Sequence, residues 1–73
     1  MSAVINISVN GEPAEAAVGC SVEELLEARG IIGERRNGIA VAVNLSVVPR
    51  SAWATTAVND GDKVEIVTAV QGG

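Results

Sequence analysis

Apolar and polar side chains alternate with a period of two near both ends of the chain. Residues 4–9 place Ile5, Ile7 and Val9 on one side of an extended backbone and polar side chains between them. Residues 63–70 alternate in the same way. This period is that of a strand with one buried face, so both segments are predicted to be strands of a sheet that is covered on one side.

A tight hairpin is predicted directly after the first strand. Asn10 and Gly11 both accept positive φ, and the pair is a strong signal for a two-residue turn. Pro13 is expected to belong to the loop and not to a central strand, because it has no N–H to give to a ladder. A second strand is then predicted over residues 14–18.

One amphipathic helix follows the hairpin. Ser21 and Glu24 have the spacing of a capping box, and Gly30 supplies a stop. Three apolar residues of this helix share one stripe: Val22, Leu25 and Leu26. Residues 30–38 hold three glycines among polar residues, so they are expected to form a mobile surface loop with solvated arginines.

Two further strands are predicted in the second half. Residues 39–44 form a smooth apolar run that suits a central strand, and residues 45–49 predict a short strand that Pro49 places at an edge. Ser51 begins a turn or short helix that directs Trp53 inward. The element order indicates an α+β domain with a mixed four- to five-stranded sheet packed on one helix, in which the first and last strands pair in parallel.

Length and composition bound the class of protein. The 73 residues allow one domain, assigned to residues 1–70, followed by a flexible tail of residues 71–73. The net charge of -4 opposes nucleic acid as a ligand. No basic and apolar leader and no apolar run long enough for a membrane span is found, so the expected location is the cytoplasm, away from membranes.

Few catalytic or metal-binding arrangements can be built from these residues. The chain has no histidine and one cysteine, which excludes a disulfide framework, a zinc site and a nucleophile paired with histidine within one chain. The carboxylates show no spacing typical of an acid–base pair. Cys20 precedes the helix and is expected to be a structural cysteine without a chemical role.

The segment Gln71-Gly72-Gly73 is the most informative candidate site. Two residues without Cβ make a thin strap that can enter a narrow channel of a partner enzyme. Such a strap presents the terminal carboxylate of Gly73 as a chemical group.

The second half of the chain contains the segments 41–44, 47–53, 60–67 and 69–73. These four segments resemble the ThiS family of thiamine-biosynthesis sulfur carriers, which has the β-grasp or ubiquitin-like fold. The most specific part is Val48-Pro49-Arg50 with Trp53 three residues later. The resemblance departs from the family in the length of the loop 30–38 and in Cys20.

The resemblance implies a carrier cycle on Gly73. A ubiquitin-activating-type adenylyltransferase that uses ATP and magnesium would adenylate Gly73, with Gly72 and Gln71 recognised as the tail. A persulfide, such as that of a cysteine desulfurase, would then give a thiocarboxylate that delivers sulfur to thiazole synthase. The chain itself would bind no cofactor and no metal, and it would be a protein cosubstrate instead of an enzyme.

Two alternatives stay open at this point. The carrier could serve another pathway, for molybdopterin, cysteine or tRNA thiolation. The chain could also be a ubiquitin-like or TGS-like interaction module whose terminal glycines are inert.

Strand alternation also predicts where a partner docks. If the larger residues face the helix, the small apolar ones lie on the uncovered face of the sheet. Arg50 is a further candidate contact, with a surface arginine of little consequence as its alternative. The predicted partner interface consists of Ala40, Ala42, Arg50, Val67 and Ala69.

Overall fold

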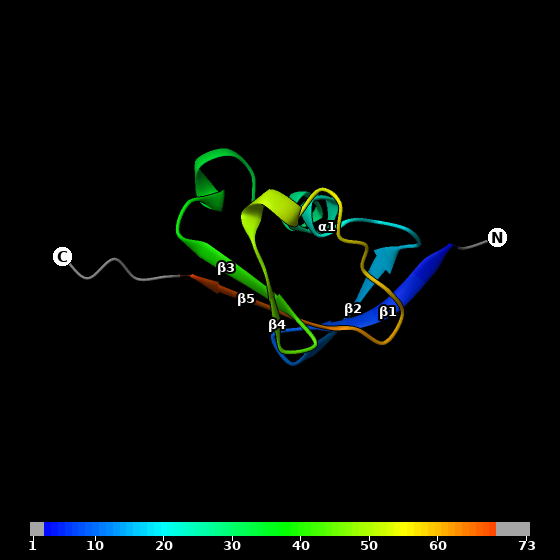
Figure 1. The fold of residues 1–73 in the computed structure, drawn as a ribbon. Helices are drawn as coiled ribbons and strands as arrows, with labels where there is room; N and C mark the ends of the chain where they lie inside the picture. The colour runs from blue at the N-terminus through cyan, green and yellow to red at the C-terminus, as the bar shows by residue number, and fades with distance from the viewer. Residues whose placement is uncertain (1–2, 69–73) are drawn as a thin grey trace.

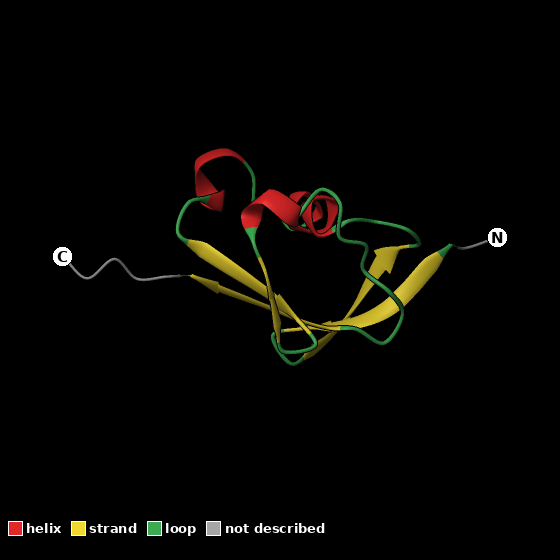
Figure 2. Cartoon of the chain, in the orientation of Figure 1, coloured by secondary structure: helices red, strands yellow, loops and turns green. Residues whose placement is uncertain are grey.

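Five strands form one mixed sheet, and α1 packs across one of its faces (Figure 1). The structure is a computed structural model that describes residues 3–68. Two short 3₁₀ helices, Gly33–Arg36 and Arg50–Ala52, lie on the same side of the sheet as α1 (Figure 2). The main elements are β1 (Val4–Val9), β2 (Glu12–Ala17), α1 (Val22–Ala28), β3 (Ile39–Val43), β4 (Ser46–Val48) and β5 (Lys63–Thr68).

The strand order is β2-β1-β5-β3-β4, which places β5 in the centre. β1 pairs with β5 in parallel, and the other neighbouring strands are antiparallel. The predicted parallel pairing of the first and last strands is thus confirmed. β1 and β2 are joined by Asn10 and Gly11 with φ of 53° and 83°, as a hairpin turn with two left-handed residues requires.

The helix is capped as its sequence predicts. The Ser21 hydroxyl accepts a hydrogen bond from the Glu24 N–H at 3.1 Å, and a Glu24 carboxylate oxygen accepts one from the Ser21 N–H at 2.9 Å. Val22, Leu25 and Leu26 are all buried. The predicted capping box and apolar stripe are confirmed.

The core between α1 and the sheet is aliphatic apart from Trp53. Trp53 is 2% exposed, and its indole N–H donates to the Val48 carbonyl oxygen at 3.0 Å, so its only polar atom is satisfied. Its predicted inward position is confirmed. The buried apolar residues are Ile5, Ile7, Val9, Cys20, Val22, Leu25, Leu26, Val41, Val48, Trp53, Val58 and Val64.

The predicted bounds of β2, β3 and β4 are each wrong by one or two residues, and β3 ends at Val43. β2 begins at Glu12 and contains Pro13, which pairs with Ser8. Because the Ser8 N–H bonds toward the β5 side, the nitrogen of Pro13 faces the outer edge of the sheet, where no donor is needed. β4 begins only at Ser46, since Leu45 lies in the β3–β4 turn with a φ of 71°.

The sequence predicts that the arginines of residues 30–38 are solvated, but in the structure Arg35 and Arg36 both make specific contacts. The Arg36 guanidinium lies 3.1 Å from the Glu27 carboxylate and 3.6 Å from that of Glu23, and its side chain is only 17% exposed. Arg35 donates to the carbonyl oxygen of Gly30. These contacts join the 3₁₀ helix to α1 and to the residue Gly30 that follows it.

Candidate functional site

The candidate site is the end of β5 together with the sheet face beside it. β5 is held between β1 and β3 and reaches Thr68, from which the chain continues toward Gly73. Four residues assigned to the site lie outside the described residues: Ala69, Gln71, Gly72 and Gly73.

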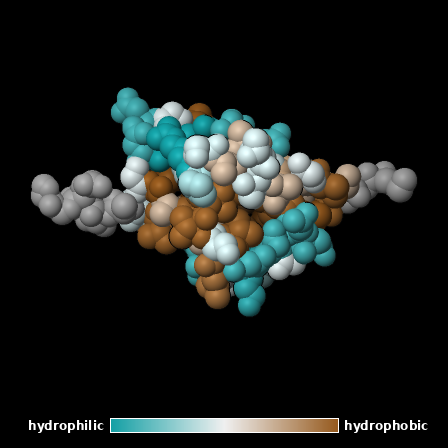
Figure 3. All heavy atoms as spheres, in the orientation of Figure 1, coloured by the Kyte–Doolittle hydropathy of each residue, from teal (hydrophilic) through white to brown (hydrophobic). Residues whose placement is uncertain are grey.

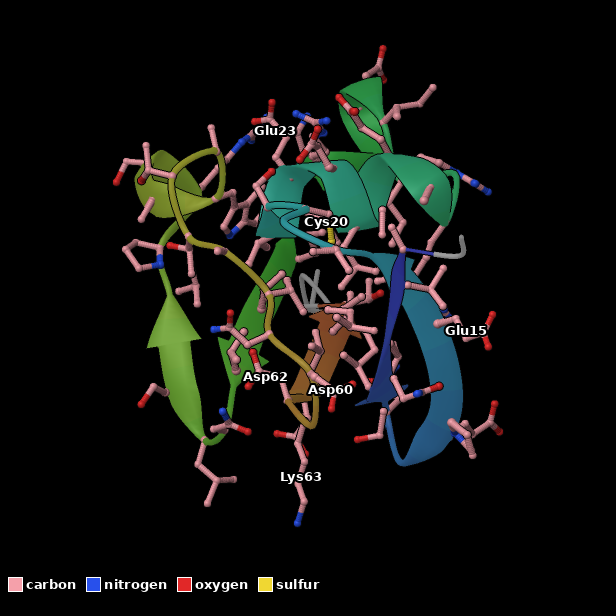
Figure 4. All side chains as sticks on the ribbon, turned by 90° about the vertical axis from the view of Figure 1, so that its right-hand side faces the viewer. Glu15, Cys20, Glu23, Asp60, Asp62 and Lys63 are labelled. Atoms are coloured by element: carbon pink, nitrogen blue, oxygen red, sulfur yellow. The ribbon has the colours of Figure 1, made fainter. Side chains whose placement is uncertain are left out.

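The start of β5 is fixed by side chains of the preceding loop and of the β3–β4 turn. The Asn44 amide oxygen accepts from the Lys63 N–H at 2.9 Å, and its amide nitrogen donates to Asp62 at 3.0 Å. Asp60 accepts from the backbone N–H of Asn6 at 2.8 Å. Figure 4 shows Asp60 and Asp62 in this loop and Lys63 pointing away from the body of the protein.

A second asparagine contacts β5 closer to its end. The Asn10 amide oxygen accepts a hydrogen bond from the Ile66 N–H at 2.8 Å, and the amide nitrogen donates to the Ile66 carbonyl oxygen at 3.2 Å. Asn10 belongs to the β1–β2 turn, so this side chain joins two segments that are distant in the sequence. β5 is therefore held by side chains at both of its halves.

The face of the sheet opposite α1 carries a small apolar patch across β3, β4 and β5. Ala40 pairs with Val67, and Ala42 pairs with Val47, so the four residues are cross-strand neighbours. Val67 is 58% exposed and Val47 is 74% exposed. Apolar atoms gather in the lower middle of Figure 3, where Figure 1 places the β3–β4 hairpin. We call Ala40, Ala42, Val47 and Val67 the open-face patch.

The other half of the same face is more polar. Glu65 of β5 lies opposite Ala42, and Asn6 of β1 lies opposite Glu15 of β2. The open-face patch is therefore an apolar area with a polar border, as is typical of contact sites on protein surfaces.

Arg50 does not lie on this face, so the predicted interface is divided. Its guanidinium is 5.8 Å from the centre of the Trp53 ring and donates to the Asn37 side-chain oxygen at 2.9 Å. Both contacts are on the α1 side of the sheet. Arg50 cannot share one flat contact with Val67.

Cys20 is 8% exposed and lies between α1 and the sheet (Figure 4). Burial, followed by the negative charge of Glu24, raises the pKa of its thiol. A cavity of about 150 Å³ beside it is lined mainly by apolar side chains, including Ala16 and Leu25. This burial agrees with the structural role expected for Cys20, and its thiol is poorly suited to act as a nucleophile.

Residues 3–68 contain no cluster of metal-ligating side chains and no long apolar helix. Within this range no three His, Cys, Asp or Glu side chains are grouped so that they could hold a metal ion. No helix in the described part is long and apolar enough to cross a membrane.

Val47 and the two asparagine side-chain contacts were missed from the sequence. Val47 could have been found, because it alternates with the buried Val48 in β4. Asn10 gave only a turn signal, and Asn44 was predicted to end the strand 39–44, whereas it lies in the β3–β4 turn. The bonds of both side chains to β5 depend on how distant segments meet.

Comparison with known proteins places this geometry in a family. The model of the ThiS family matches residues 7–73. The chain is 36% identical to the sulfur carrier protein ThiS of Escherichia coli over 69 residues, which cover 94% of this chain and 100% of that protein. It superposes on the crystal structure of the thiamine biosynthesis protein (ThiS) from Geobacter metallireducens with a TM-score of 0.81 and 35% identity, covering 94% of this chain and 100% of that one.

A longer protein also contains a similar segment. A thiazole synthase of Paramagnetospirillum magneticum is 42% identical over 69 residues, which are 94% of this chain but 20% of that protein. The chain therefore spans about a fifth of the length of this relative.

Proposed function

The chain belongs to the ThiS family of sulfur carriers of thiamine biosynthesis, and we propose that it carries sulfur on the carboxyl group of Gly73. The family match, which extends through residue 73, is the observation that carries this proposal. The β-grasp fold supports it, because β5 lies in the centre of the sheet and its last residue, Thr68, is five positions before Gly73 in the sequence.

The chemistry begins with activation of a poor electrophile. A carboxylate resists attack because its charge is delocalised and its leaving group is oxide-like. The Gly73 carboxylate attacks the α-phosphorus of ATP on a ubiquitin-activating-type adenylyltransferase, and pyrophosphate leaves. The product is an acyl adenylate, a mixed anhydride with AMP as its leaving group. Magnesium and ATP belong to that enzyme, and this chain supplies the reacting end.

Sulfur then replaces AMP. The terminal sulfur of a persulfide, such as that of a cysteine desulfurase, forms a bond to the Gly73 carbonyl carbon while the bond to AMP breaks. A thiol reduces the resulting acyl disulfide, which releases the thiocarboxylate and leaves a disulfide on the donor side. The thiocarboxylate sulfur is a nucleophile, so the protein acts as a cosubstrate and not as a catalyst.

Thiazole synthase is the proposed acceptor of this sulfur. Two proteins named thiazole synthase, from Paramagnetospirillum magneticum and Magnetococcus marinus, contain a segment similar to nearly the whole of this chain. A carrier and its acceptor joined in one polypeptide would act on the same pathway. A cytoplasmic location is proposed with this role, since the partners use ATP and reduced thiols.

Docking is assigned to the open-face patch and the tail. Val67 belongs to the patch and also to β5, so a partner that covers the patch lies beside the start of the tail. Gly72 and Gln71 are proposed to enter the channel of the enzyme, where the absence of a Cβ on Gly72 permits close approach.

Intact-mass analysis tests the proposed function. The protein is incubated with the cognate adenylyltransferase, ATP, a persulfide donor and a thiol, and we expect a mass gain of one oxygen replaced by one sulfur. Fragmentation should place this gain on Gly73. A variant with one residue added after Gly73 is the control and should gain nothing. The same gain in that variant, or no gain in the natural chain, would refute the proposal.

A further inference from the structure

The main-chain pairing of β1 with β5 ends before β5 does. The Asn10 backbone N–H donates to the Val64 carbonyl oxygen at 2.9 Å, and the chain then turns away into β2. β5 continues to Thr68. Because alternate residues of a strand direct their polar groups to the same neighbour, the N–H and C=O of Ile66 face the side that β1 has left.

The Asn10 carboxamide replaces the missing part of β1. In a parallel ladder, the residue that donates to Val64 would accept from the Ile66 N–H through its own carbonyl, and the next donor along would bond to the Ile66 carbonyl. Here the Asn10 side-chain oxygen accepts from that N–H at 2.8 Å, and the side-chain nitrogen donates to that carbonyl at 3.2 Å. One side chain thus makes both hydrogen bonds of the next step of the ladder.

Turn geometry alone does not require asparagine at this position. Asn10 has a φ of 53°, and glycine adopts this conformation with less strain. The amide group is therefore the property that distinguishes asparagine from glycine here. It acts on Ile66, close to the point where β5 leads into the tail.

We infer that Asn10 is a positioning residue for the sulfur-carrying end, an inference that rests on the proposed function. By fixing Ile66 on the side that β1 no longer covers, the carboxamide keeps the last part of β5 in register with β3. The direction of β5 at Thr68, where the strand ends, is then restricted before any enzyme binds. This restriction lowers the ordering needed to bring the Gly73 carboxylate to ATP.

Asn10→Gly and Asn44→Gly form a matched pair for the test. Both asparagines have positive φ in a hairpin turn, and both bind β5 through the side chain, so glycine preserves each turn and removes each contact. Asn44 acts on Lys63 at the start of the strand, whereas Asn10 acts on Ile66 near its end. The measurements are amide hydrogen exchange of the free protein and steady-state kinetics of thiocarboxylate formation, both below the melting temperatures.

For Asn10→Gly we expect the Ile66 amide to exchange about tenfold faster or more, because it loses its acceptor. The kcat should fall about 3- to 10-fold while KM stays within about twofold, because docking of the body is retained and fewer bound tails are aligned. For Asn44→Gly, the Ile66 exchange rate, kcat and KM should all stay within about twofold of the natural chain.

Three results would overturn the inference: unchanged Ile66 exchange in Asn10→Gly, unchanged kcat in that variant, or an equal loss of kcat in both variants. If the natural chain forms no thiocarboxylate, the proposed function itself is refuted. The exchange result is independent of activity, so the two failures can be told apart.

Discussion

Replacing Val67 by Asp tests whether the open-face patch is where partners dock. Val67 is 58% exposed, so less than half of its surface is removed from water in the free protein. Full burial of a valine is worth at least about 1.5 kcal/mol, and strand preference spans about 1 kcal/mol. Less than half of the first value plus most of the second gives a stability cost of about 1 to 1.5 kcal/mol, which lowers the melting temperature of a domain of this size by about 4 to 12 °C.

The effect on binding should be larger. In a complex the new carboxylate would be transferred from water into an apolar contact without a partner, which costs several kcal/mol. We expect the affinity for the adenylyltransferase and for thiazole synthase to fall at least about tenfold, equal to about 1.4 kcal/mol. Isothermal titration calorimetry measures this loss, and circular dichroism measures the melting temperature.

Val4→Asp is the matched control. Val4 is 46% exposed and, by strand alternation, lies on the same face, but it belongs to β1 outside the open-face patch. The control adds the same charge to the same fold, so it accounts for long-range repulsion. Equal affinities of the two variants would refute docking at the patch, and a melting temperature about 15 °C lower in Val67→Asp would show that its stability cost was misjudged.

Four further outcomes are expected. Trp53→Ala should cost about 3 to 5 kcal/mol, because it empties a buried site, so thermal denaturation should show an unfolded or barely folded protein and a normal melting curve would contradict the packing. Gly72→Ala should slow adenylation sharply with an unchanged melting temperature, since its Cβ crowds the proposed channel, and unaltered pyrophosphate release would indicate a loosely held tail. The pKa of the Cys20 thiol is raised in the folded state, so the free energy of unfolding is at its full value below the ordinary pKa of 9.0 and falls as the pH rises above 9.0. In urea titrations, Cys20→Ala should make this fall with pH smaller. An identical fall in the variant would exclude the thiol as its cause. Arg50→Ala should cost about 0.5 to 1 kcal/mol in urea denaturation and leave partner affinity unchanged, and weaker binding would show that docking extends to the α1 side.

Local patterns predicted most of the elements and failed where distant segments meet. The periods of two and of about 3.6 located the strands and α1, because the buried side of each element is recorded in its own residues. Asn10 was predicted as a turn residue, but its bonds to Ile66 span 56 positions and no local pattern contains them. Arg36 likewise looked solvated because its partners, Glu23 and Glu27, become neighbours only when the chain folds back on α1.

The candidate site was likewise predictable only where a local pattern places a residue. Alternation placed Ala40, Ala42 and Val67 on one face without any knowledge of the fold. It could not place Arg50, because the chain crosses from β4 to the α1 side through a short 3₁₀ helix that has no repeating pattern. The tail residues were assigned from the sequence alone and stay predictions.

The central place of β5 has a mechanical consequence. An enzyme that drew in the tail, as proposed above, would pull on Thr68 at the end of β5, which lies between β1 and β3, and the relevant direction is the axis of this strand. A force in this direction shears the hydrogen bonds on both sides of the strand together, whereas a pull across an edge strand would open them one after another. Because many hydrogen bonds would bear the force together, the fold should resist unfolding while an enzyme acts on Gly73. If the tail were attached to an edge strand, β2 or β4, a pull on it could instead break the hydrogen bonds of that strand one after another.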